Sequence, residues 1–277
     1  MKEGPSCRFP FFTIITASYN CKRHIISTIN SIRDQRYNFI EWIIVDGGST
    51  DGTVEVIKES ANLVSHFISE KDSGIYDAWN KACKLISGNW VLFLGAGDEF
   101  CDENVLYNLS NYVREAPDFL IFYGRVRVQR GRHIIEVTGE VDTVKWQKGV
   151  VSIPCHQGVV HPAVLFEGSN SFDETYKVLG DAKFLIKKQI EGYRFKYINL
   201  DISVMDADGI SSKPELSAVI YNEQDRIRNE LKLARTFVSE FYRKRLLLKS
   251  FGYLYFGKRF SFIVNIWRLL SGKKRYD

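Results

Sequence analysis

The chain has 277 residues and a formal net charge of +5, with 45% hydrophobic and 26% charged residues. This composition is typical of a globular protein and excludes a disordered or collagen-like chain, since it includes only 6 Pro and 20 Gly. The 5 Cys never form a C-x-x-C pair, which argues against a disulfide scaffold or zinc ribbon and favours a reducing compartment. No long apolar run opens the chain and none reaches about 18 residues, so neither a signal peptide nor a transmembrane helix is expected.

The first 110 residues alternate between short apolar runs and amphipathic segments. Strands are expected at 11–16, 39–45, 66–69 and 90–94, and helices at 25–33, 53–60 and 74–86. This βαβαβαβ order predicts a mostly parallel sheet with helices on both faces, in which ligands bind beyond the carboxyl ends of the strands. Polar turns at 17–20, 46–49 and 95–98 follow three of these strands and are therefore expected to meet at that edge.

The remainder of the chain has a mixed pattern. A hairpin is expected from 119–128 and 133–137, a helix at 182–191, a strand at 195–204, and a long helical stretch at 223–244. We therefore expect a domain of residues 1–212, with a nucleotide-binding half of about 1–115 and an acceptor half of about 116–212. A helical extension, 213–277, follows it.

Four motifs stand in order along the first half of the chain: FFTIITASYN, IIVDGGSTDGT, SEKDSGIYDAWNKA and WVLFLGAGDEF. Together they resemble the family-2 inverting glycosyltransferases, and they look most like the bacterial polysaccharide enzymes of the colanic-acid and capsule type. The resemblance is strong over 11–105 and weaker over 150–212. It implies an α/β GT-A (Rossmann-like) fold, a nucleotide-diphosphate-sugar donor with uridine diphosphate as carrier, and a single displacement that inverts the anomeric carbon.

The resemblance also implies which residues hold the donor. The expected nucleotide contacts are Thr16, Ala17, Tyr19, Asp46, Asp72, Gly74, Asn80, Lys81 and Gly97. Asp46 is expected to hydrogen-bond the base or ribose, and the loop of Asp72 and Gly74 to close on the base. On the residues alone, the turn after Asp46 also fits a helix N-cap supplied by one of residues 49–51, an interpretation compatible with the first.

Asp98 matches the last residue of the family's Asp-x-Asp-type metal motif, and the resemblance implies Mg²⁺ or Mn²⁺ as cofactor. A divalent cation held by a carboxylate neutralises the charge that develops on a departing diphosphate, whose oxygens supply further ligands. The sequence departs from the motif at Ala96, where the first acid is expected, so Asp98 is the expected ligand and Glu99 a weaker second. The alternative for Asp98 is a helix cap.

An inverting transferase also needs a carboxylate that accepts the proton of the attacking hydroxyl. The segment YKVLGDAKF resembles the family's segment in which an acid opens a helix behind the acceptor site. Asp181 is the matching acid and the expected catalytic base, with Asp173 and Glu174 as runners-up. The alternative role of Asp181 is an N-cap of the helix at 182–191.

Three further residues are expected near the acceptor or the diphosphate. His156 and Gln157 match a His-Gln pair of the family, although a buried structural histidine is the alternative for His156. The surroundings of His156 and His161 do not predict a zinc site. Ser211 matches a closing loop expected to fold over the diphosphate, or lies in an ordinary turn.

The charge is concentrated in a basic tail. Residues 241–277 hold ten Lys and Arg against one acid, whereas residues 1–240 hold 28 against 32. Interleaved aromatic residues favour a helix lying on an anionic membrane, because the apolar stretch 260–270 is too short to span one. Packing of the aromatics on the rest of the chain is the alternative. No nucleic-acid motif accompanies the charge, so nucleic acid is not an expected partner.

Together these features predict a hexosyltransferase of bacterial surface polysaccharide biosynthesis. We expect it to be peripheral on the cytoplasmic face of the inner membrane and to act on a polyprenyl-linked or glycan acceptor. A sugar nucleotidyltransferase is one alternative, but its Gly-rich, basic loop is missing at residues 17–20. A non-catalytic, membrane-bound glycan-binding protein is another, suggested by the missing first acid. A Rossmann dehydrogenase is excluded because no G-x-G-x-x-G follows the first strand.

Overall fold

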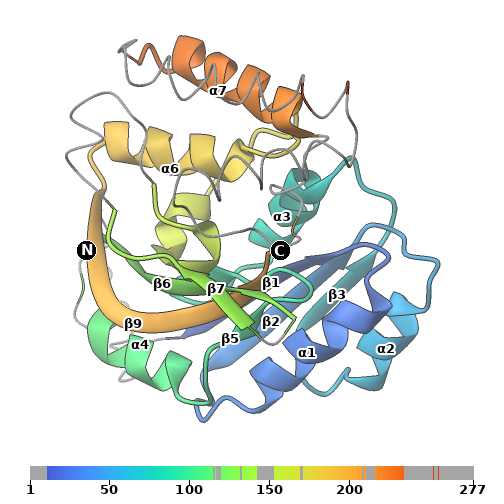
Figure 1. Cartoon of the computed structure of the whole chain (residues 1–277). Coiled ribbons are helices and arrows are strands. Elements are labelled where there is room, and N and C mark those ends of the chain that lie inside the picture. The colour runs from blue at the N-terminus through green and yellow to red at the C-terminus, as the bar shows by residue number, and fades with distance from the viewer. Residues whose placement is uncertain are drawn as a thin grey trace. The chain divides into compact units, whose positions relative to one another are not determined.

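The computed structural model in Figure 1 describes residues 11–114, 116, 120–131, 133–141, 153–168, 171–207, 209, 216–233, 252 and 255. The chain forms two compact units, Met1–Asp142 with Ser152–Ala207, and Thr143–Val151 with Asp208–Asp277. In the second unit, the helix α7 (Ser217–Glu230) starts before the expected stretch at 223–244, whose part beyond 233 lies outside the described residues. Within the described part of the chain, every helix is too short or too polar to cross a bilayer.

The predicted alternation of strands and helices in the first 110 residues is confirmed. The elements are β1 (Phe12–Ser18), α1 (Lys22–Arg33), β2 (Ile40–Asp46), α2 (Thr53–Glu59), β3 (His66–Ser69), α3 (Ile75–Cys83) and β4 (Trp90–Phe93). The pairs β1–β2, β1–β4 and β2–β3 are parallel, as expected. Strands β1, β2 and β4 are buried almost throughout, which explains why their sequences are nearly continuous apolar runs.

The later elements complete the sheet. They are β5 (Glu99–Phe100), α4 (Val105–Val113), β6 (Leu120–Arg130), β7 (His133–Val137), η1 (His156–Gly158), β8 (Val159–Pro162), η2 (Ala163–Phe166), α6 (Gly180–Ile190) and β9 (Arg194–Asp206). The predicted hairpin is confirmed as the antiparallel pair β6–β7. The sequence pattern does not predict β8, which pairs antiparallel with both β4 and β6 and so joins the two halves of the sheet.

Among the described residues the strands form one sheet in the order β3-β2-β1-β4-β8-β6-β9-β5, with β7 paired to β6. The long strand β9 curves strongly (Figure 1). Its far end pairs antiparallel with β5, opposing Glu99 with Val204 and Phe100 with Ser203. The loop between β4 and β5, residues 94–98, is therefore held at both ends by the sheet.

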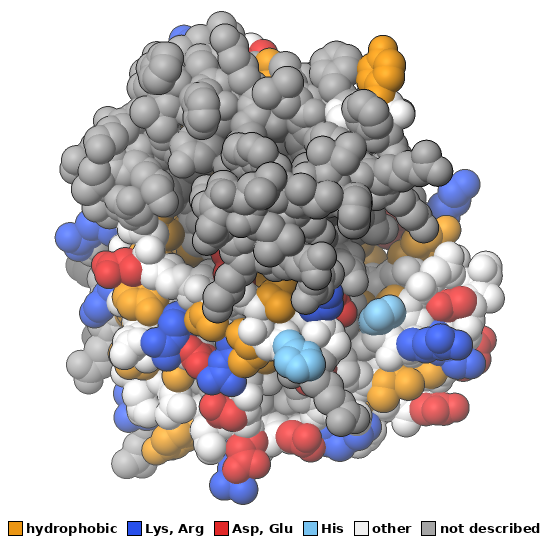
Figure 2. Space-filling view, in the orientation of Figure 1, with side chains coloured by type: hydrophobic (Ala, Val, Ile, Leu, Met, Phe, Trp, Pro, Cys, Tyr) orange, Lys and Arg blue, Asp and Glu red, His pale blue; other side chains and the backbone are white. Residues whose placement is uncertain are grey.

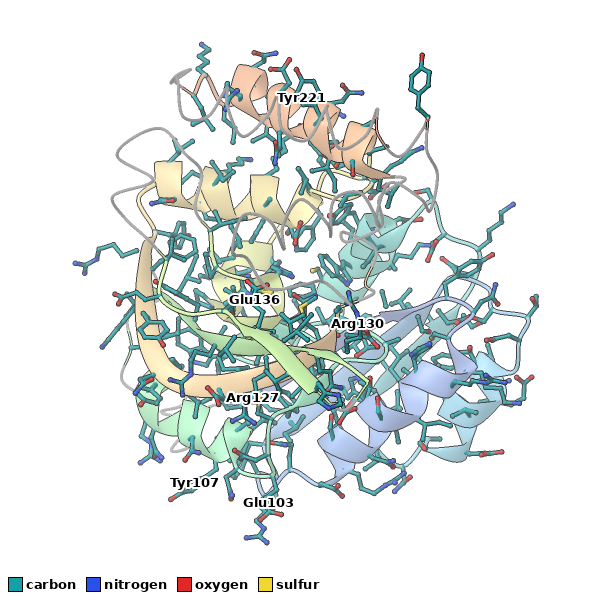
Figure 3. All side chains as sticks on the ribbon, in the orientation of Figure 1. Glu103, Tyr107, Arg127, Arg130, Glu136 and Tyr221 are labelled. Carbon is teal, nitrogen blue, oxygen red and sulfur yellow. The ribbon has the colours of Figure 1, made fainter. Side chains whose placement is uncertain are left out.

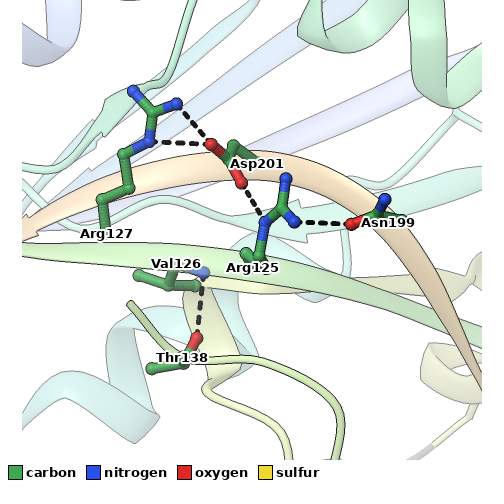
Figure 4. Close-up of polar contacts among 6 residues, drawn as sticks. All are labelled: Arg125, Val126, Arg127, Thr138, Asn199 and Asp201. Carbon is green, nitrogen blue, oxygen red and sulfur yellow. Dashed lines mark hydrogen bonds and ion pairs between the residues drawn. The ribbon is translucent and has the colours of Figure 1, made fainter. Parts of the chain in front are cut away.

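A charged cluster ties β6 to β9 (Figure 4). Arg125 and Arg127 both donate to Asp201, with Arg127 Nε 2.8 Å from Asp201 Oδ2, and Arg125 also donates to Asn199. Although burial favours the protonated form, the two guanidinium groups lower the pKa of Asp201. Arg127, Arg130 and Glu136 lie along the β6–β7 hairpin (Figure 3). Acidic and basic side chains are interspersed over the described part of the face in Figure 2. The sequence of segment 241–277, in contrast, is predominantly basic.

A buried carboxylate, that of Glu41, joins three segments at the amino ends of the strands. Glu41 is 4% exposed and accepts hydrogen bonds from the Thr13 hydroxyl, from the Ser87 N–H at 2.6 Å and from the Gly88 N–H at 3.2 Å. Burial favours its protonated form, but these hydrogen bonds outweigh burial and lower the pKa of Glu41. The carboxylate therefore fastens β1 and β2 to the turn that enters β4.

We expect Glu41→Ala to lower the free energy of unfolding at pH 7 by roughly 1.5–3 kcal/mol, because it leaves buried donors without their charged acceptor. The folded-state pKa lies below the unfolded value of 4.5, so this contribution is present above pH 4.5 and is lost as the pH falls through the folded pKa. Urea unfolding at several pH values measures it. The exposed Glu59→Ala is the control, and an equal effect of both variants at pH 7 would contradict the prediction.

Candidate active site

The carboxyl end of β2 is organised by Asp46. Its side chain is fully buried and accepts hydrogen bonds from the hydroxyls of Ser18 at 3.0 Å, Ser69 at 2.9 Å and Ser49, and from the N–H groups of Gly48 at 3.1 Å and Ser49 at 2.9 Å. Burial favours the protonated form, but these donors lower the pKa of Asp46, so the carboxylate is charged. It ties together the ends of β1, β2 and β3.

The turn after β1 is fastened to the turn after β2. The Asn20 N–H donates to Ser49 Oγ at 2.8 Å, and the Thr50 N–H donates to Asn20 Oδ1 at 2.9 Å. Asn20 takes a left-handed backbone conformation, with φ of 46°. Tyr19 is 64% exposed beside this junction. The two turns therefore form one edge, as the strand order predicts.

Two residues expected to contact the nucleotide are engaged inside the protein. Thr16 is fully buried, and its hydroxyl accepts a hydrogen bond from Trp42 Nε1 at 3.0 Å. The amide of Asn80 bonds the carbonyl of Phe172 at 2.9 Å, the N–H of Phe172 at 3.0 Å and Glu174 Oε1 at 2.8 Å. The side chains of Thr16 and Asn80 thus hold neighbouring segments of the protein together by internal hydrogen bonds.

The loop before α3 lies against the end of β2. Gly47 is so close to Asp72 that a Cβ at this position would lie 2.6 Å from Asp72 Oδ2. The Gly74 N–H donates to Asp72 Oδ1 at 3.1 Å, and Gly74 has a φ of 137° with open space beside it. Burial raises the pKa of Asp72, helped by the nearby charges of other acids. Lys81 pairs with Glu70 at 2.8 Å on the same helix-loop segment.

The loop between β4 and β5 is held by Thr28 of α1. The Gly97 N–H donates to Thr28 Oγ1 at 2.9 Å, and the Thr28 hydroxyl donates to the carbonyl of Asp98 at 2.8 Å. Gly97 has a φ of 108°, which favours glycine. Asp98 Oδ2 accepts the Gly95 N–H at 3.1 Å. The alternative role of Asp98 as a helix cap is wrong, because β5 follows it.

Sequence analysis missed Thr28. The spacing of isoleucines in the segment that forms α1 indicates an apolar stripe that includes Ile26. In the structure Ile26 is 45% exposed, whereas Thr28 is fully buried. A single hydroxyl in an apolar stripe gives little sequence signal, since many buried threonines bond only to their own helix.

Burial raises the pKa of Asp98 to about 7; the Gly95 N–H and the Gln157 side chain lower it, while Asp206 and Glu99 raise it. Gln157 in turn accepts the thiol of Cys155 at 3.1 Å. A chain of contacts thus leads from Asp98 to Cys155.

The thiol of Cys155 is affected by burial and by the charges of several acids. Burial raises its pKa to about 12, opposed by Gln157, and the negative charges of Asp98 and Asp181 raise it further. Contacts through neighbouring residues join the predicted metal ligand, Asp98, to the predicted base, Asp181, 83 positions away in the chain. Gln157 bonds Asp98, and the ring of His156 next to it stacks on Trp79. Trp79 packs against Tyr76, whose hydroxyl bonds Asp181.

Asp181 lies in the first turn of α6, which begins at Gly180, so it is not the N-cap of this helix. Burial raises the pKa of Asp181, while the Ala182 N–H and the Tyr76 hydroxyl lower it. Both runners-up are engaged elsewhere: Asp173 accepts Lys183 Nζ at 2.6 Å and Glu174 accepts the amide of Asn80. Asp181 has the Tyr76 hydroxyl as its partner, 3.2 Å from its Oδ1.

His156 and His161 belong to an aromatic cluster behind the centre. The His156 ring stacks on Trp79 with centroids 4.9 Å apart and lies 5.2 Å from the His161 ring. Burial lowers the pKa of His156 to about 3, so both imidazoles are neutral, His161 being shifted in the same direction. Among the described residues, neither Nε2 atom has a hydrogen-bond partner. The predicted closing-loop residue Ser211 lies outside the described residues.

The profile described as "Glycosyl transferase family 2" matches residues 13–156, half of the chain. The chain belongs to glycosyl transferase family 2. It is a glycosyltransferase, as the motifs predict. The family match spans the donor-side loops and ends at His156, so the segment with Asp181 lies beyond it.

Two relatives of this family-2 glycosyltransferase come from mycobacteria. A PGL/p-HBAD biosynthesis glycosyltransferase of Mycobacterium bovis (strain BCG / Pasteur 1173P2) is 29% identical over 181 residues, which cover 64% of this chain and 69% of the relative. An uncharacterised glycosyltransferase of Mycobacterium tuberculosis (strain CDC 1551 / Oshkosh) is 28% identical over 222 residues, covering 76% and 80%.

Solved structures confirm the GT-A fold. Residues 1–349 of S. aureus TarS in complex with UDP-GlcNAc match with a TM-score of 0.63 at 20% identity, covering 94% of this chain and 77% of that one. The mannosyltransferase PcManGT from Pyrobaculum calidifontis, in complex with GDP-Man and Mn²⁺, matches with a TM-score of 0.60 at 18% identity, covering 91% and 72%.

We expect Thr28→Val to lower turnover about tenfold to a hundredfold, because it releases the loop that places Asp98. It should also lower the melting temperature, since the Gly97 N–H loses its acceptor. Initial rates of nucleotide release from a sugar nucleotide, together with thermal unfolding, check both effects. Thr28→Ser keeps the hydroxyl and should restore the rate; wild-type turnover in Thr28→Val would limit Thr28 to a structural role.

Proposed function

We propose that this glycosyltransferase inverts the anomeric carbon as it moves a sugar from a nucleotide-diphosphate donor, a UDP-sugar, to a lipid-linked or glycan hydroxyl in bacterial surface polysaccharide biosynthesis. One observation carries this proposal: a path of contacts through Gln157, His156, Trp79 and Tyr76 joins Asp98 to Asp181. A metal-dependent inverting displacement requires one carboxylate that holds the cation beside the departing diphosphate, and another across the sugar that acts as base. The UDP-GlcNAc bound to TarS supports the choice of donor.

We propose that the donor lies along the edge formed by the turns after β1 and β2 and the loop before α3. Ala17 lines it from β1 and Tyr19 from the turn that follows, while Asp72 and Gly74 close on the base. Asp46 holds the edge that the base or ribose meets, because its carboxylate already accepts hydrogen bonds from three serines. Lys81, which pairs with Glu70 and Asp77, borders this edge from α3. Gly97 permits close approach of the diphosphate.

Asp98 fits a divalent cation, Mg²⁺ or Mn²⁺. Its carboxylate is desolvated and has the acids Asp206 and Glu99 nearby, so a positive charge there would offset unfavourable burial. Among the described residues no three His, Cys, Asp or Glu side chains gather around one point, so Asp98 would share the ion with diphosphate oxygens. A bound cation would neutralise the charge of the leaving diphosphate.

Asp98→Ala should abolish turnover, whereas Glu99→Ala should retain most of it, because only Asp98 is fastened in the loop by Thr28 and Gly95. The assay is release of nucleoside diphosphate from UDP-glucose, UDP-galactose, UDP-N-acetylglucosamine or GDP-mannose, with and without Mn²⁺. Pyrophosphate exchange would indicate a nucleotidyltransferase instead, and no turnover of any donor would favour a binding protein. Near-normal rates of Asp98→Ala, or in chelator, would contradict the metal assignment.

We propose Asp181 as the base that accepts the proton of the acceptor hydroxyl. Burial raises its pKa, which makes the carboxylate a stronger proton acceptor, and its position at the start of α6 leaves it partly exposed. Gln157, whose side chain accepts the Cys155 thiol, is proposed with His156 and Ser211 to border the diphosphate or acceptor.

Asp181→Asn keeps the size of the side chain but removes the proton acceptor, and we expect a loss of roughly 10²–10⁴-fold in turnover. Donor affinity should persist, as read from the rise in melting temperature on adding UDP. Glu191→Gln, at the exposed end of the same helix, is the matched control. If Asp181→Asn turned over normally, or failed only in binding UDP, Asp181 would not be the base.

We further propose that the basic segment 241–277 holds the enzyme on the cytoplasmic face of the inner membrane, where a polyprenyl-linked acceptor resides. Ten Lys and Arg beside aromatic residues support this, since each base near an anionic surface adds on the order of 1 kcal/mol. Apart from Gly252 and Tyr255, the segment lies outside the described residues.

A further inference from the structure

Tyr76 connects the helix of the donor loop to the segment that carries the proposed base. Its hydroxyl lies 2.7 Å from the carbonyl of Val178 and 3.2 Å from Asp181 Oδ1, and it accepts the Gly180 N–H at 2.8 Å. Tyr76 itself is 3% exposed. One buried hydroxyl thus contacts two backbone groups and one carboxylate at the start of α6.

The fit between Tyr76 and this segment is close. A Cβ on Gly180 would lie 2.8 Å from the Tyr76 ring, so only glycine allows the backbone to reach the hydroxyl. The ring also packs edge-on against Trp79 at 5.5 Å and stacks on Phe172 at 6.0 Å. The hydroxyl is consequently fixed in direction by packing, and a phenylalanine would keep the packing but lose the hydrogen bonds.

The first turn of α3, which carries Tyr76, directly follows the donor loop of Asp72 and Gly74. Tyr76 follows Gly74 by two residues, and the Ser73 N–H donates to Asp77 at 2.9 Å, which closes the loop onto α3. Any shift of this first turn of α3 would move the Tyr76 hydroxyl. The donor loop and the base segment therefore share one rigid turn of helix.

We propose that Tyr76 is a positioning residue, which orients the Asp181 carboxylate toward the acceptor and makes that orientation depend on the donor loop of Asp72 and Gly74. This inference rests on the proposed function of Asp181 as base. Tyr76 does not touch substrate; it acts through the start of α6. Its phenol on α3 and the Cys155 thiol before η1 are the titratable groups that the described chain brings to Asp181.

The test is Tyr76→Phe, with Tyr123→Phe as a matched control. Tyr123 is also buried and its hydroxyl accepts one backbone hydrogen bond, from the Val141 N–H at 3.3 Å, on the β6 side of the sheet. Both variants lose one buried hydroxyl, so both should lower the melting temperature. The assay is nucleoside diphosphate release from the most active donor of the four-member panel, measured from about pH 5 to 9.

In Tyr76→Phe, the acidic limb of the pH–rate profile should move upward by about one pH unit, because a hydrogen bond to the ionised Asp181 is lost. This gives about tenfold lower kcat on that limb, with donor KM nearly unchanged. Tyr123→Phe should leave the limb in place. A Tyr76→Phe enzyme with an unmoved limb, or with a raised donor KM alone, would overturn the positioning role while leaving Asp181 as base. Normal turnover of Asp181→Asn would overturn both.

Discussion

The charged Asp46 carboxylate, buried where β1, β2 and β3 end, is the interaction on which the donor side depends. A buried charge is costly unless hydrogen bonds compensate it, and here three serine hydroxyls and two backbone N–H groups do so. Ser18 and Ser69 end the strands β1 and β3, and Gly48 and Ser49 belong to the turn after β2. The turns consequently hold one shape before any nucleotide arrives, which lowers the entropic cost of binding it.

The acceptor side relies on apolar packing instead. Trp79, Phe93 and Phe172 surround two neutral histidines, and this water-poor layer lies behind Cys155 and the start of α6. Burial in such surroundings disfavours the charged forms of Asp98 and Asp181, which explains their raised pKa values. The site thus combines the hydrogen-bonded turns around Asp46 with the apolar layer of Trp79, Phe93 and Phe172.

Much of this was predictable from sequence, because the strands are continuous apolar runs and the strand-end motifs match a family. The rest depended on long-range contacts. The four-residue strand β8 is stabilised by partners about 40 and 70 positions away, and no local pattern reports them. Asn80 lies in a donor-side motif, yet its amide serves Phe172 and Glu174. A motif match identifies a residue such as Asn80 but does not show whether its side chain contacts the donor or the acceptor half of the protein.

The bonds from α3 to residues 172–181 bear on how such enzymes could be recombined. Donor and acceptor halves divide near residue 115 by sequence, which suggests a crossover point for chimeras of two family-2 enzymes. Tyr76 and Asn80, however, lie on the donor side of that point and hold the backbone of the acceptor side. A hybrid joined at 115 would pair a foreign base segment with these anchors. Acceptor exchange therefore has to transplant the face of α3 together with the acceptor half.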